Sequence, residues 1–252
     1  MIIAELLANL YSGTSPYSSC EEKYVDHGYP HTNILPDLLQ TLFTTIRPTY
    51  IVECGSMLGG SAMRMAQVLK DNAMDTEIIC IDPFTGDVNM WDWERNHGWK
   101  FLRLENGIPT IYKRFLANCK YGGFESKILP INATASVGVK LLQRLRDQRR
   151  ISALPNYIYL DSAHEKDETF IELSICWNAL HASAGAGAAG VLFGDDWSWD
   201  AVKHDVIKFA NVVKDDIDRD ALQKMHALVA GSSVFNDTIL LYKGQWVLFK
   251  RT

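Results

Sequence analysis

Residues 50–61 read YIVECGSMLGGS, and this stretch decides the fold. It starts as a short run of apolar, β-favouring residues, turns through a glycine-rich segment, and leads into SAMRMAQVLK (61–70), whose apolar residues have helical spacing. Glycines between a strand and a helix let the backbone turn sharply and approach a ligand closely, and the helix N-terminus offers it unpaired N–H groups. The stretch therefore predicts the first strand, ligand-binding loop and helix of an α/β domain.

The same alternation of apolar runs and helical patterns continues along the chain. Further strands are predicted at 77–82, 126–132, 157–161 and 190–196, and their nearly continuous apolar character is typical of parallel strands covered on both faces. The helices predicted between and after these strands span residues 99–119, 134–145, 165–180 and 201–213.

The C-terminal end has a different pattern. Residues 238–243 (TILLYK) and 245–250 (QWVLFK) are strand-like runs that lie too close together for a crossover helix. They predict an antiparallel hairpin at one edge of the sheet. The predicted fold class is therefore α/β, with a doubly wound, seven-stranded, mostly parallel sheet that ends in a C-terminal antiparallel hairpin.

The chain has 252 residues, a length that one α/β domain with an extension can reach. Residues 1–47 precede the predicted sheet and contain a helical pattern at 33–45, so we interpret them as an N-terminal helical extension or lid. Residues 48–252 would form the main domain.

Composition and charge argue against several classes of partner. The formal net charge is −5 and there is no long basic run, whereas contacts with a nucleic-acid backbone need clustered Lys and Arg. No segment reaches the roughly 20 apolar residues of a membrane span, and the start of the chain lacks the pattern of a secretory signal. The five cysteines are odd in number and widely spaced, which indicates a reducing compartment. We therefore expect a cytoplasmic protein without a nucleic-acid or membrane partner; the sequence indicates no particular oligomeric state.

An acidic residue ends the second predicted strand. Asp82 stands where a carboxylate can accept hydrogen bonds from both hydroxyls of a ribose, although it could also cap the turn at Pro83. The loop before it has the spacing E-x-G-x-x-x-G-G-S, which differs from the G-x-G-x-x-G of dinucleotide-binding proteins, and taken alone it could be a structural turn.

Two further strand ends carry acidic residues. Asp161 closes the strand at 157–161, and Asp195 and Asp196 close the strand at 190–196. The carboxyl ends of parallel strands converge on one crevice, where three carboxylates repel each other unless a cation is present, and oxygen ligands of this kind suit Mg²⁺ or Ca²⁺. The alternative is that Asp195 or Asp196 caps the helix that follows.

The strand, glycine loop, helix and acidic strand end together resemble the S-adenosylmethionine site of class I methyltransferases. This resemblance implies that Glu53 orients the amino group of the cofactor, directly or through water, and that Asp82 holds the ribose. It also places the end of the third strand where this family contacts adenine. The cofactor-binding residues implied in this way are Glu53, Gly55, Ser56, Gly59, Ser61, Asp82, Asn132, Ala133 and Thr134.

The acidic positions are similar to those of metal-dependent small-molecule O-methyltransferases, such as the catechol and macrolide-sugar enzymes. These enzymes place an Asp after the fourth strand and an Asp-Asp or Asp-Asn pair after the fifth, which implies Asp161, Asp195 and Asp196 as metal ligands. The phrases DSAHEKDETF (161–170) and GDDW (194–197) also resemble a bacterial methyltransferase family close to the cephalosporin hydroxylases. The resemblance covers roughly residues 48–210. It departs from the family where Gly and Ala repeats replace the usual Pro-Gly-Gly before the fifth strand.

His164 lies three residues after Asp161, where the catechol enzymes carry a basic residue. An imidazole of near-neutral pKa beside a metal-bound hydroxyl is a candidate general base, so we take His164 and Asp161 as the catalytic candidates. A histidine at the start of a helix, satisfied by the backbone, would have the same spacing. Five tryptophans stand near these segments and could form either aromatic walls for an acceptor or ordinary core. They are Trp91, Trp93, Trp99, Trp197 and Trp199.

The predicted function is methylation of a small-molecule hydroxyl by S-adenosylmethionine, with Mg²⁺ or another hard divalent cation lowering the pKa of that hydroxyl. Three alternatives stay open. A metal-independent N- or C-methyltransferase would use the acidic cluster to bind an amine. A nucleotide-sugar or NAD enzyme on a Rossmann-like sheet would need a different glycine spacing. A binding module with the same fold would hold the cofactor without turnover.

Overall fold

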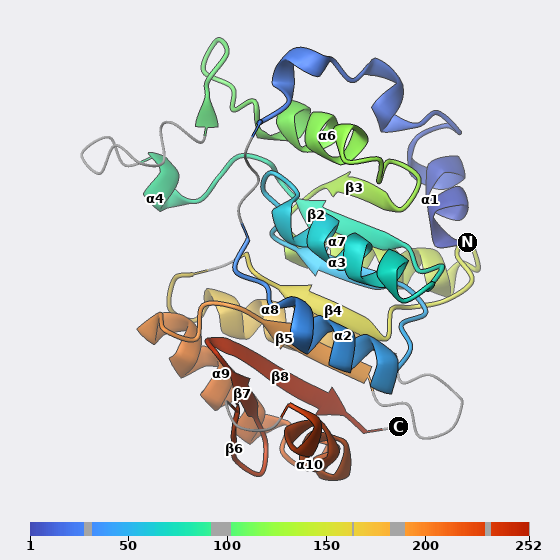
Figure 1. Cartoon of the computed structure of the whole chain (residues 1–252). Helices are drawn as coiled ribbons and strands as arrows, with labels where there is room; N and C mark the ends of the chain where they lie inside the picture. Colours follow the sequence, from blue (N-terminus) through green and yellow to red (C-terminus); the bar gives the residue numbers. More distant parts are fainter. Residues whose placement is uncertain (28–31, 92–101, 163, 182–189, 230–232, 252) are drawn as a thin grey trace.

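An eight-stranded sheet forms the centre of the protein (Figure 1). The computed structural model describes residues 1–27, 32–91, 102–162, 164–181, 190–229 and 233–251. The strand order is β3-β2-β1-β4-β5-β8-β7-β6; the first five strands along the chain are parallel, and the last three pair in antiparallel fashion. The strands are β1 (Ile51–Cys54), β2 (Ile78–Asp82), β3 (Ile128–Asn132), β4 (Tyr157–Leu160), β5 (Gly190–Gly194), β6 (Ser233–Phe235), β7 (Leu240–Tyr242) and β8 (Gln245–Lys250).

This architecture confirms the predicted doubly wound sheet and its C-terminal hairpin, which is formed by β7 and β8. The hairpin inserts β8 beside β5, so that β8 is antiparallel to both of its neighbours. The seven predicted strands are all present. The three-residue strand β6 adds an eighth at the edge, and such a short segment has no periodicity by which the sequence could reveal it.

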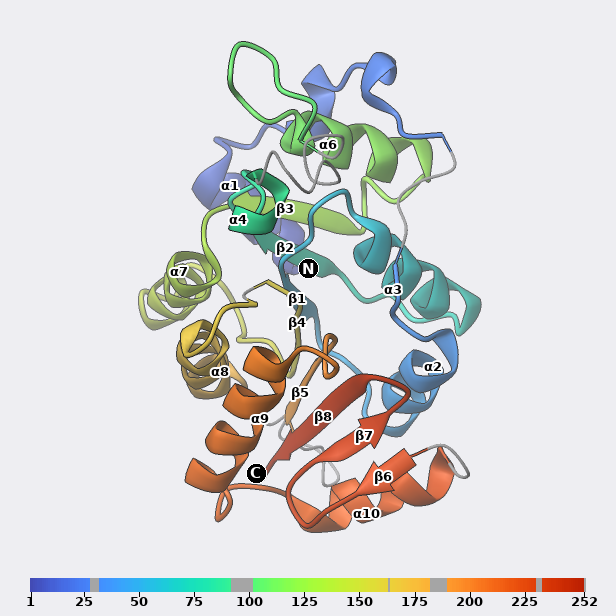
Figure 2. The same ribbon diagram turned by 90° about the vertical axis from the view of Figure 1, so that its left-hand side faces the viewer.

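Helices cover both faces of the sheet (Figure 2). Helices α7, α8 and α9 lie on one face, and α2, α3 and α10 lie on the other. All residues of β1, β2, β4 and β5 are buried, which explains their continuous apolar sequence. The helices are α1 (Ile2–Leu10), α2 (Pro36–Thr45), α3 (Gly60–Asp71), α4 (Val88–Trp91), α6 (Ile111–Tyr121), α7 (Ala135–Asp147), α8 (Glu168–Ala179), α9 (Asp200–Val212) and α10 (Arg219–Leu228), with 3₁₀ segments η1 (Pro16–Ser19) and η2 (Glu22–Tyr24).

The helix predicted at 99–119 is wrong over residues 103–110, which are not helical. Its last part corresponds to α6, which begins at Ile111, and residues 99–101 lie outside the described residues. Asn106 and Gly107 both have positive φ, at 51° and 79°, and Glu105 pairs with Ile108 across them. An Asn-Gly pair favours a tight turn of this kind, and this local preference prevails over the helical pattern.

The N-terminal segment covers an exposed edge of the sheet. Strand β3 is an edge strand, and its outward carbonyl groups need hydrogen-bond donors. The Tyr17 hydroxyl donates to the carbonyl of Ile128 at 2.9 Å, and the Tyr11 hydroxyl donates to that of Pro130. Residues before the sheet therefore supply donors to two carbonyl groups of this edge strand. The division into an extension (1–47) and a main domain (48–252) stays a prediction.

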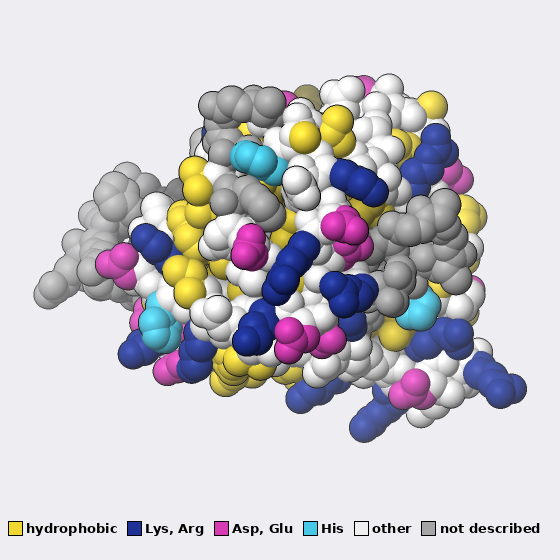
Figure 3. Space-filling model, turned by 90° about the horizontal axis from the view of Figure 1, so that it is seen from below, with side chains coloured by type: hydrophobic (Ala, Val, Ile, Leu, Met, Phe, Trp, Pro, Cys, Tyr) yellow, Lys and Arg dark blue, Asp and Glu magenta, His cyan; other side chains and the backbone are white. Residues whose placement is uncertain are grey.

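The surface in Figure 3 is the side that lies lowest in Figure 1. Lys and Arg side chains are interspersed there with Asp and Glu, and among the described residues they form no continuous basic area on this face. In the part of the chain that the structure describes, no helix is both long enough and apolar enough to cross a membrane.

Gly138 allows α7 to pack closely on the sheet. A Cβ atom at this position would lie 2.4 Å from Cγ2 of Ile81, a fully buried residue of β2. Alanine is the better helix former by about 1 kcal/mol, but a contact as short as 2.4 Å should cost about 2–3 kcal/mol, the upper part of the range for overpacking a core. We expect Gly138→Ala to lower the free energy of unfolding by about 1–2 kcal/mol in urea denaturation. The control Val137→Ala, at an exposed neighbour in α7, should change it by less than about 0.5 kcal/mol. A Gly138→Ala protein at least as stable as the wild type would contradict this packing.

Candidate active site

A cavity of about 450 Å³ lies at the carboxyl ends of the parallel strands. The loops that follow β1, β2, β4 and β5 form its walls, and Thr32 and Asn33 of the N-terminal segment complete the lining. Ligands of open α/β sheets bind at this end, where the order of the strands reverses; here that point lies between β1 and β4.

The glycine loop after β1 forms one wall of the cavity. Gly55 has a φ of 85°, and a Cβ atom there would lie 1.9 Å from the carbonyl oxygen of Asp161 at the end of β4. Gly59, at the N-cap of α3, has a φ of 87° and packs against Phe115 and Cys119 of α6. Both conformations are ones that residues with a side chain rarely adopt. The glycine spacing therefore reflects two positions where a side chain would not fit; the role of the loop in ligand binding stays a prediction.

Asp82 holds this loop in shape. Its Oδ2 accepts hydrogen bonds from the backbone N–H groups of Ser56 and Met57, both at 2.8 Å, and its Oδ1 accepts one from Phe84. Burial raises the pKa of Asp82 in spite of these hydrogen bonds. A carboxylate has about four acceptor positions, so about one is left for a ligand. Asp82 lines the cavity, and its contact with a ribose stays a prediction.

Glu53 lies beneath the cavity wall. It is fully buried and accepts hydrogen bonds from the Ser61 hydroxyl and, at 3.2 Å, from the Cys80 thiol. Burial raises the pKa of Glu53 to about 7. Ser61 and Ser56 line the cavity, whereas Glu53 and Gly59 are not among its lining residues. Glu53 could therefore affect a bound cofactor only indirectly, through residues of the loop or through a water molecule.

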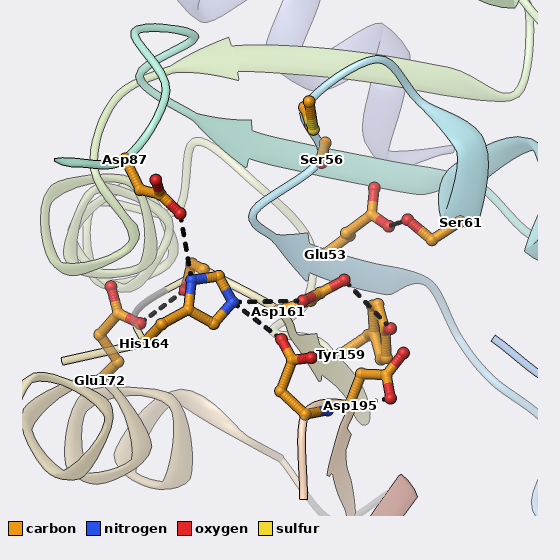
Figure 4. Close-up of polar contacts among 12 residues, drawn as sticks. Glu53, Ser56, Ser61, Asp87, Tyr159, Asp161, His164, Glu172 and Asp195 are labelled. Atoms are coloured by element: carbon orange, nitrogen blue, oxygen red, sulfur yellow. Dashed lines mark hydrogen bonds and ion pairs between the residues drawn. The ribbon is translucent and has the colours of Figure 1, made fainter. Parts of the chain in front are cut away.

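Asp161, His164 and Asp196 form a cluster in the cavity (Figure 4). The Nε2 atom of His164 lies 2.8 Å from Oδ2 of Asp196 and 3.8 Å from Oδ1 of Asp161. One ligand atom from each of the three residues lies within 4.8 Å of the others, which is close enough to hold a metal ion. The cluster contains two of the three predicted metal ligands together with the predicted base.

Asp195 points away from this cluster. Its Oδ1 accepts a hydrogen bond from the backbone N–H of Asp196 at 2.9 Å, and its carbonyl accepts one from the Trp246 indole at 3.0 Å. Burial raises the pKa of Asp195 to about 6. Asp195 still lines the cavity, so its predicted role as a ligand stays open to test.

Asp87 is a site residue that the sequence interpretation missed. It lies on the loop between β2 and α4, and its Oδ2 lies 3.4 Å from Nδ1 of His164 (Figure 4). Asp196 contacts the other ring nitrogen, Nε2. The Asp87 carboxylate also accepts a hydrogen bond from the N–H of Met90 at the start of α4. The only signal in the sequence was an acidic residue after Gly86, in a loop without periodicity.

The surrounding carboxylates determine the charge of His164. Burial acts to lower the pKa of His164, but its contacts with Asp161, Asp196 and Asp87 outweigh this effect and raise the pKa to about 12. The ring also packs against Trp199 at an interplanar angle of 38°, with centroids 5.0 Å apart. At neutral pH the imidazole is therefore a cation that neutralises part of the acidic cluster, and in that state it is a proton donor.

The predicted adenine contacts lie outside the lining of the cavity. Asn132 and Thr134 are exposed, and Ala133 donates its N–H to the carbonyl of Asp82 at 3.1 Å. Thr134 caps α7 by accepting a hydrogen bond from Val137. Their contact with adenine stays a prediction. Of the five tryptophans, Trp199 lines the cavity, Trp91 and Trp197 do not, and Trp93 and Trp99 lie outside the described residues.

No model of a known protein family matches the sequence, and no curated protein matches it. Solved structures do match the fold. An O-methyltransferase from Streptomyces achromogenes, TomG, involved in tomaymycin synthesis and bound to S-adenosylmethionine, has a TM-score of 0.54 at 14% identity over 100% of both chains. An O-methyltransferase from Bacillus cereus in complex with S-adenosylhomocysteine has a TM-score of 0.53 at 10% identity, over 99% of this chain and 97% of that one.

A third match is the cofactor-bound protein Rv0187 from MTB, with a TM-score of 0.53 at 11% identity over 99% of this chain and 96% of that one. At such low identities the likeness is one of fold. Together with the strand order it shows that the chain has the Rossmann-like fold of class I methyltransferases.

The buried Glu53 makes stability depend on pH in a specific way. Between its unfolded pKa of about 4.5 and its folded pKa of about 7, the folded protein binds more protons, so stability falls as pH rises through this window and levels off above it. We expect Glu53→Gln to remove this contribution. The free energy of unfolding of the variant minus that of the wild type should then rise by about 2–3 kcal/mol between pH 5 and pH 8. Urea denaturation at several pH values measures the difference. A constant difference across this range would show that Glu53 is not held protonated by burial.

Proposed function

We propose that the protein is an S-adenosylmethionine-dependent methyltransferase that methylates a hydroxyl of a small molecule with the help of a divalent cation. The observation that carries the proposal is one cavity that joins a glycine loop of the class I type to the cluster of Asp161, His164 and Asp196. Similar folds with bound S-adenosylmethionine or S-adenosylhomocysteine support it.

The chain's residues fit this cofactor. S-adenosylmethionine supplies an electrophilic methyl group on a positively charged sulfur. The loop at Gly55 and Ser56 brings backbone into the cavity wall, and α3 begins directly after Gly59. Asp82, Asp87 and Asp161 surround the space with acidic groups, which suits a cationic ligand.

The residues also fit a hard divalent cation. Asp161 and Asp196 present carboxylate oxygens beside His164, and oxygen donors are those that Mg²⁺ prefers. Such a cation supplies positive charge that lowers the pKa of a nearby hydroxyl. Asp195, which directly precedes Asp196, is the further donor that a small change in the loop could bring to the cluster.

His164 has two roles that depend on its charge. As an imidazolium it balances Asp87, Asp161 and Asp196, and it cannot accept a proton. A second positive charge beside Asp161 and Asp196 would lower the pKa of His164, because it would compensate the carboxylates that keep the imidazole protonated. Neutral His164 would then have a free ring nitrogen to take the proton of the acceptor hydroxyl.

The charge on His164 also favours one alternative, namely transfer without a metal. Because the imidazolium already compensates the acidic cluster, the carboxylates that line the cavity could instead bind an amine acceptor. The two functions differ in their response to a chelator: only metal-assisted transfer would be lost.

Calorimetric titration with S-adenosylmethionine, with and without Mg²⁺, tests the proposal. We expect micromolar binding in the wild type and a separate Mg²⁺ binding event. Asp196→Asn should weaken Mg²⁺ binding at least tenfold, because one of the carboxylates of the cluster is lost, and should change cofactor affinity by less than twofold.

The control is Asp200→Asn, an exposed Asp at the first residue of α9 that does not line the cavity; it should leave both affinities unchanged. Absence of cofactor binding in the wild type would exclude the methyltransferase function. Cofactor binding with no Mg²⁺ binding would favour the metal-independent alternative.

A further inference from the structure

A buried polar network joins the N-terminal segment to α6. It consists of Asp26, which follows η2, and of Arg114 and Asn118 in α6, all of which are less than a tenth exposed. The Arg114 guanidinium contacts both oxygens of Asp26, with Nε 2.8 Å from Oδ2 and Nη2 2.9 Å from Oδ1. Arg103, whose side chain is exposed, adds a contact of 2.9 Å between its Nη1 and Oδ1 of Asp26. None of these residues lines the cavity, so the site described above does not account for them.

Asn118 extends this network to the glycine loop. Its Oδ1 accepts a hydrogen bond from the backbone N–H of Asp26 at 2.9 Å, and its Nδ2 donates to the carbonyl of Leu58 at 3.0 Å. A second, longer contact of 3.4 Å joins Nδ2 to Oδ2 of Asp26. An amide side chain has one accepting end and one donating end. Because the N–H of Asp26 occupies the accepting end, the donating end faces Leu58, and the N-terminal segment thus sets the orientation of this amide.

The loop needs the donor that Asn118 provides. Leu58 is buried and stands between Met57 and Gly59, whose φ values of 44° and 87° take the loop out of any regular hydrogen-bonded ladder. A buried carbonyl without a donor is costly, so this hydrogen bond stabilises the loop in its observed conformation. Phe115 and Cys119, on the same helix as Asn118, pack against Gly59.

A purely structural role for the network is the competing explanation. A buried ion pair contributes little net stability, because the loss of hydration of both charges offsets their attraction. A structural role alone does not explain where the hydrogen bonds lead. They connect Asp26 through Asn118 to Leu58, and Leu58 lines the cavity. The N-terminal segment also reaches the cavity directly at Thr32 and Asn33.

We propose that Asn118 is a positioning residue for the cofactor, and that the N-terminal segment, through Asp26, holds the glycine loop ready to bind it. A loop that is already ordered loses less conformational freedom on binding, so its ligand binds more tightly. The identity of the ligand rests on the proposed function. The ordering of the loop by Asn118 does not.

Asn118→Ala and a matched control, Asn156→Ala, test the proposal. Asn156 is also buried; it accepts the N–H of Thr49 at 2.7 Å and donates to the carbonyl of Arg47 at 3.0 Å. The two asparagines therefore make the same pair of backbone contacts, but Asn156 makes them just before β4, at the opposite end of the strand from the cavity. Both substitutions should lower the melting temperature. Only Asn118→Ala should also raise the dissociation constant for S-adenosylmethionine, by about tenfold, with Asn156→Ala within about twofold of the wild type.

Hydrogen exchange of the backbone amides at 56–62, without ligand, provides the second readout. It should become faster in Asn118→Ala and stay unchanged in Asn156→Ala. If Asn118→Ala does not fold, Asn118→Leu replaces it, because Leu keeps about the same side-chain volume but has no donor for the carbonyl of Leu58. Equal cofactor affinity in the Asn118 variant and the wild type, or an equal loss in both alanine variants, would overturn the proposal. If the wild type binds no S-adenosylmethionine, the proposed function fails, and the exchange rates still decide whether Asn118 orders the loop.

Discussion

The site depends on how several carboxylates are held together at one end of the sheet. Asp87, Asp161 and Asp196 all approach His164, and in a partly buried space their mutual repulsion has to be compensated by positive charge. The imidazolium provides that compensation here, and a divalent cation or a cationic ligand can contribute more. The acidic cluster therefore favours positively charged ligands and ties the protonation of His164 to what is bound beside it.

The arrangement around this cluster follows from backbone contacts. Strands β1 and β4 approach so closely that Gly55 has no room for a side chain beside Asp161, and Asp82 holds the next turn of the same loop through two backbone N–H groups. On the far side of the loop, Asn118 satisfies the carbonyl of Leu58. Contacts with the end of β4, with Asp82 of β2 and with Asn118 of α6 thus hold the loop in place. The N-terminal segment contributes to that support as well as covering the edge at β3.

Sequence patterns were sufficient for the features that depend on continuous buried strands. The strand ends at Asp82, Asp161 and Asp196 could be located because each follows an apolar run, and parallel strands bring such ends together. Asp87 could not be found in this way, because a loop has no periodicity and its direction depends on tertiary packing. The pair of Asp26 and Arg114 is separated by 88 residues in the sequence and has no local signal. The helix expected at 99–119 was wrong over 103–110, because the Asn106-Gly107 turn prevailed over the pattern.

A crystal structure of the protein with S-adenosylhomocysteine and Mn²⁺ would test the central claim most directly. We expect the nucleoside and amino-acid parts to lie along the glycine loop at Gly55 and Ser56, and an anomalous Mn²⁺ peak to lie within about 2.0–2.3 Å of oxygens of Asp161 and Asp196. The central claim would be contradicted by S-adenosylhomocysteine bound elsewhere or not at all. A bound cofactor with no metal peak, and with His164 still paired to Asp196, would retain the methyltransferase and remove the cation from its mechanism.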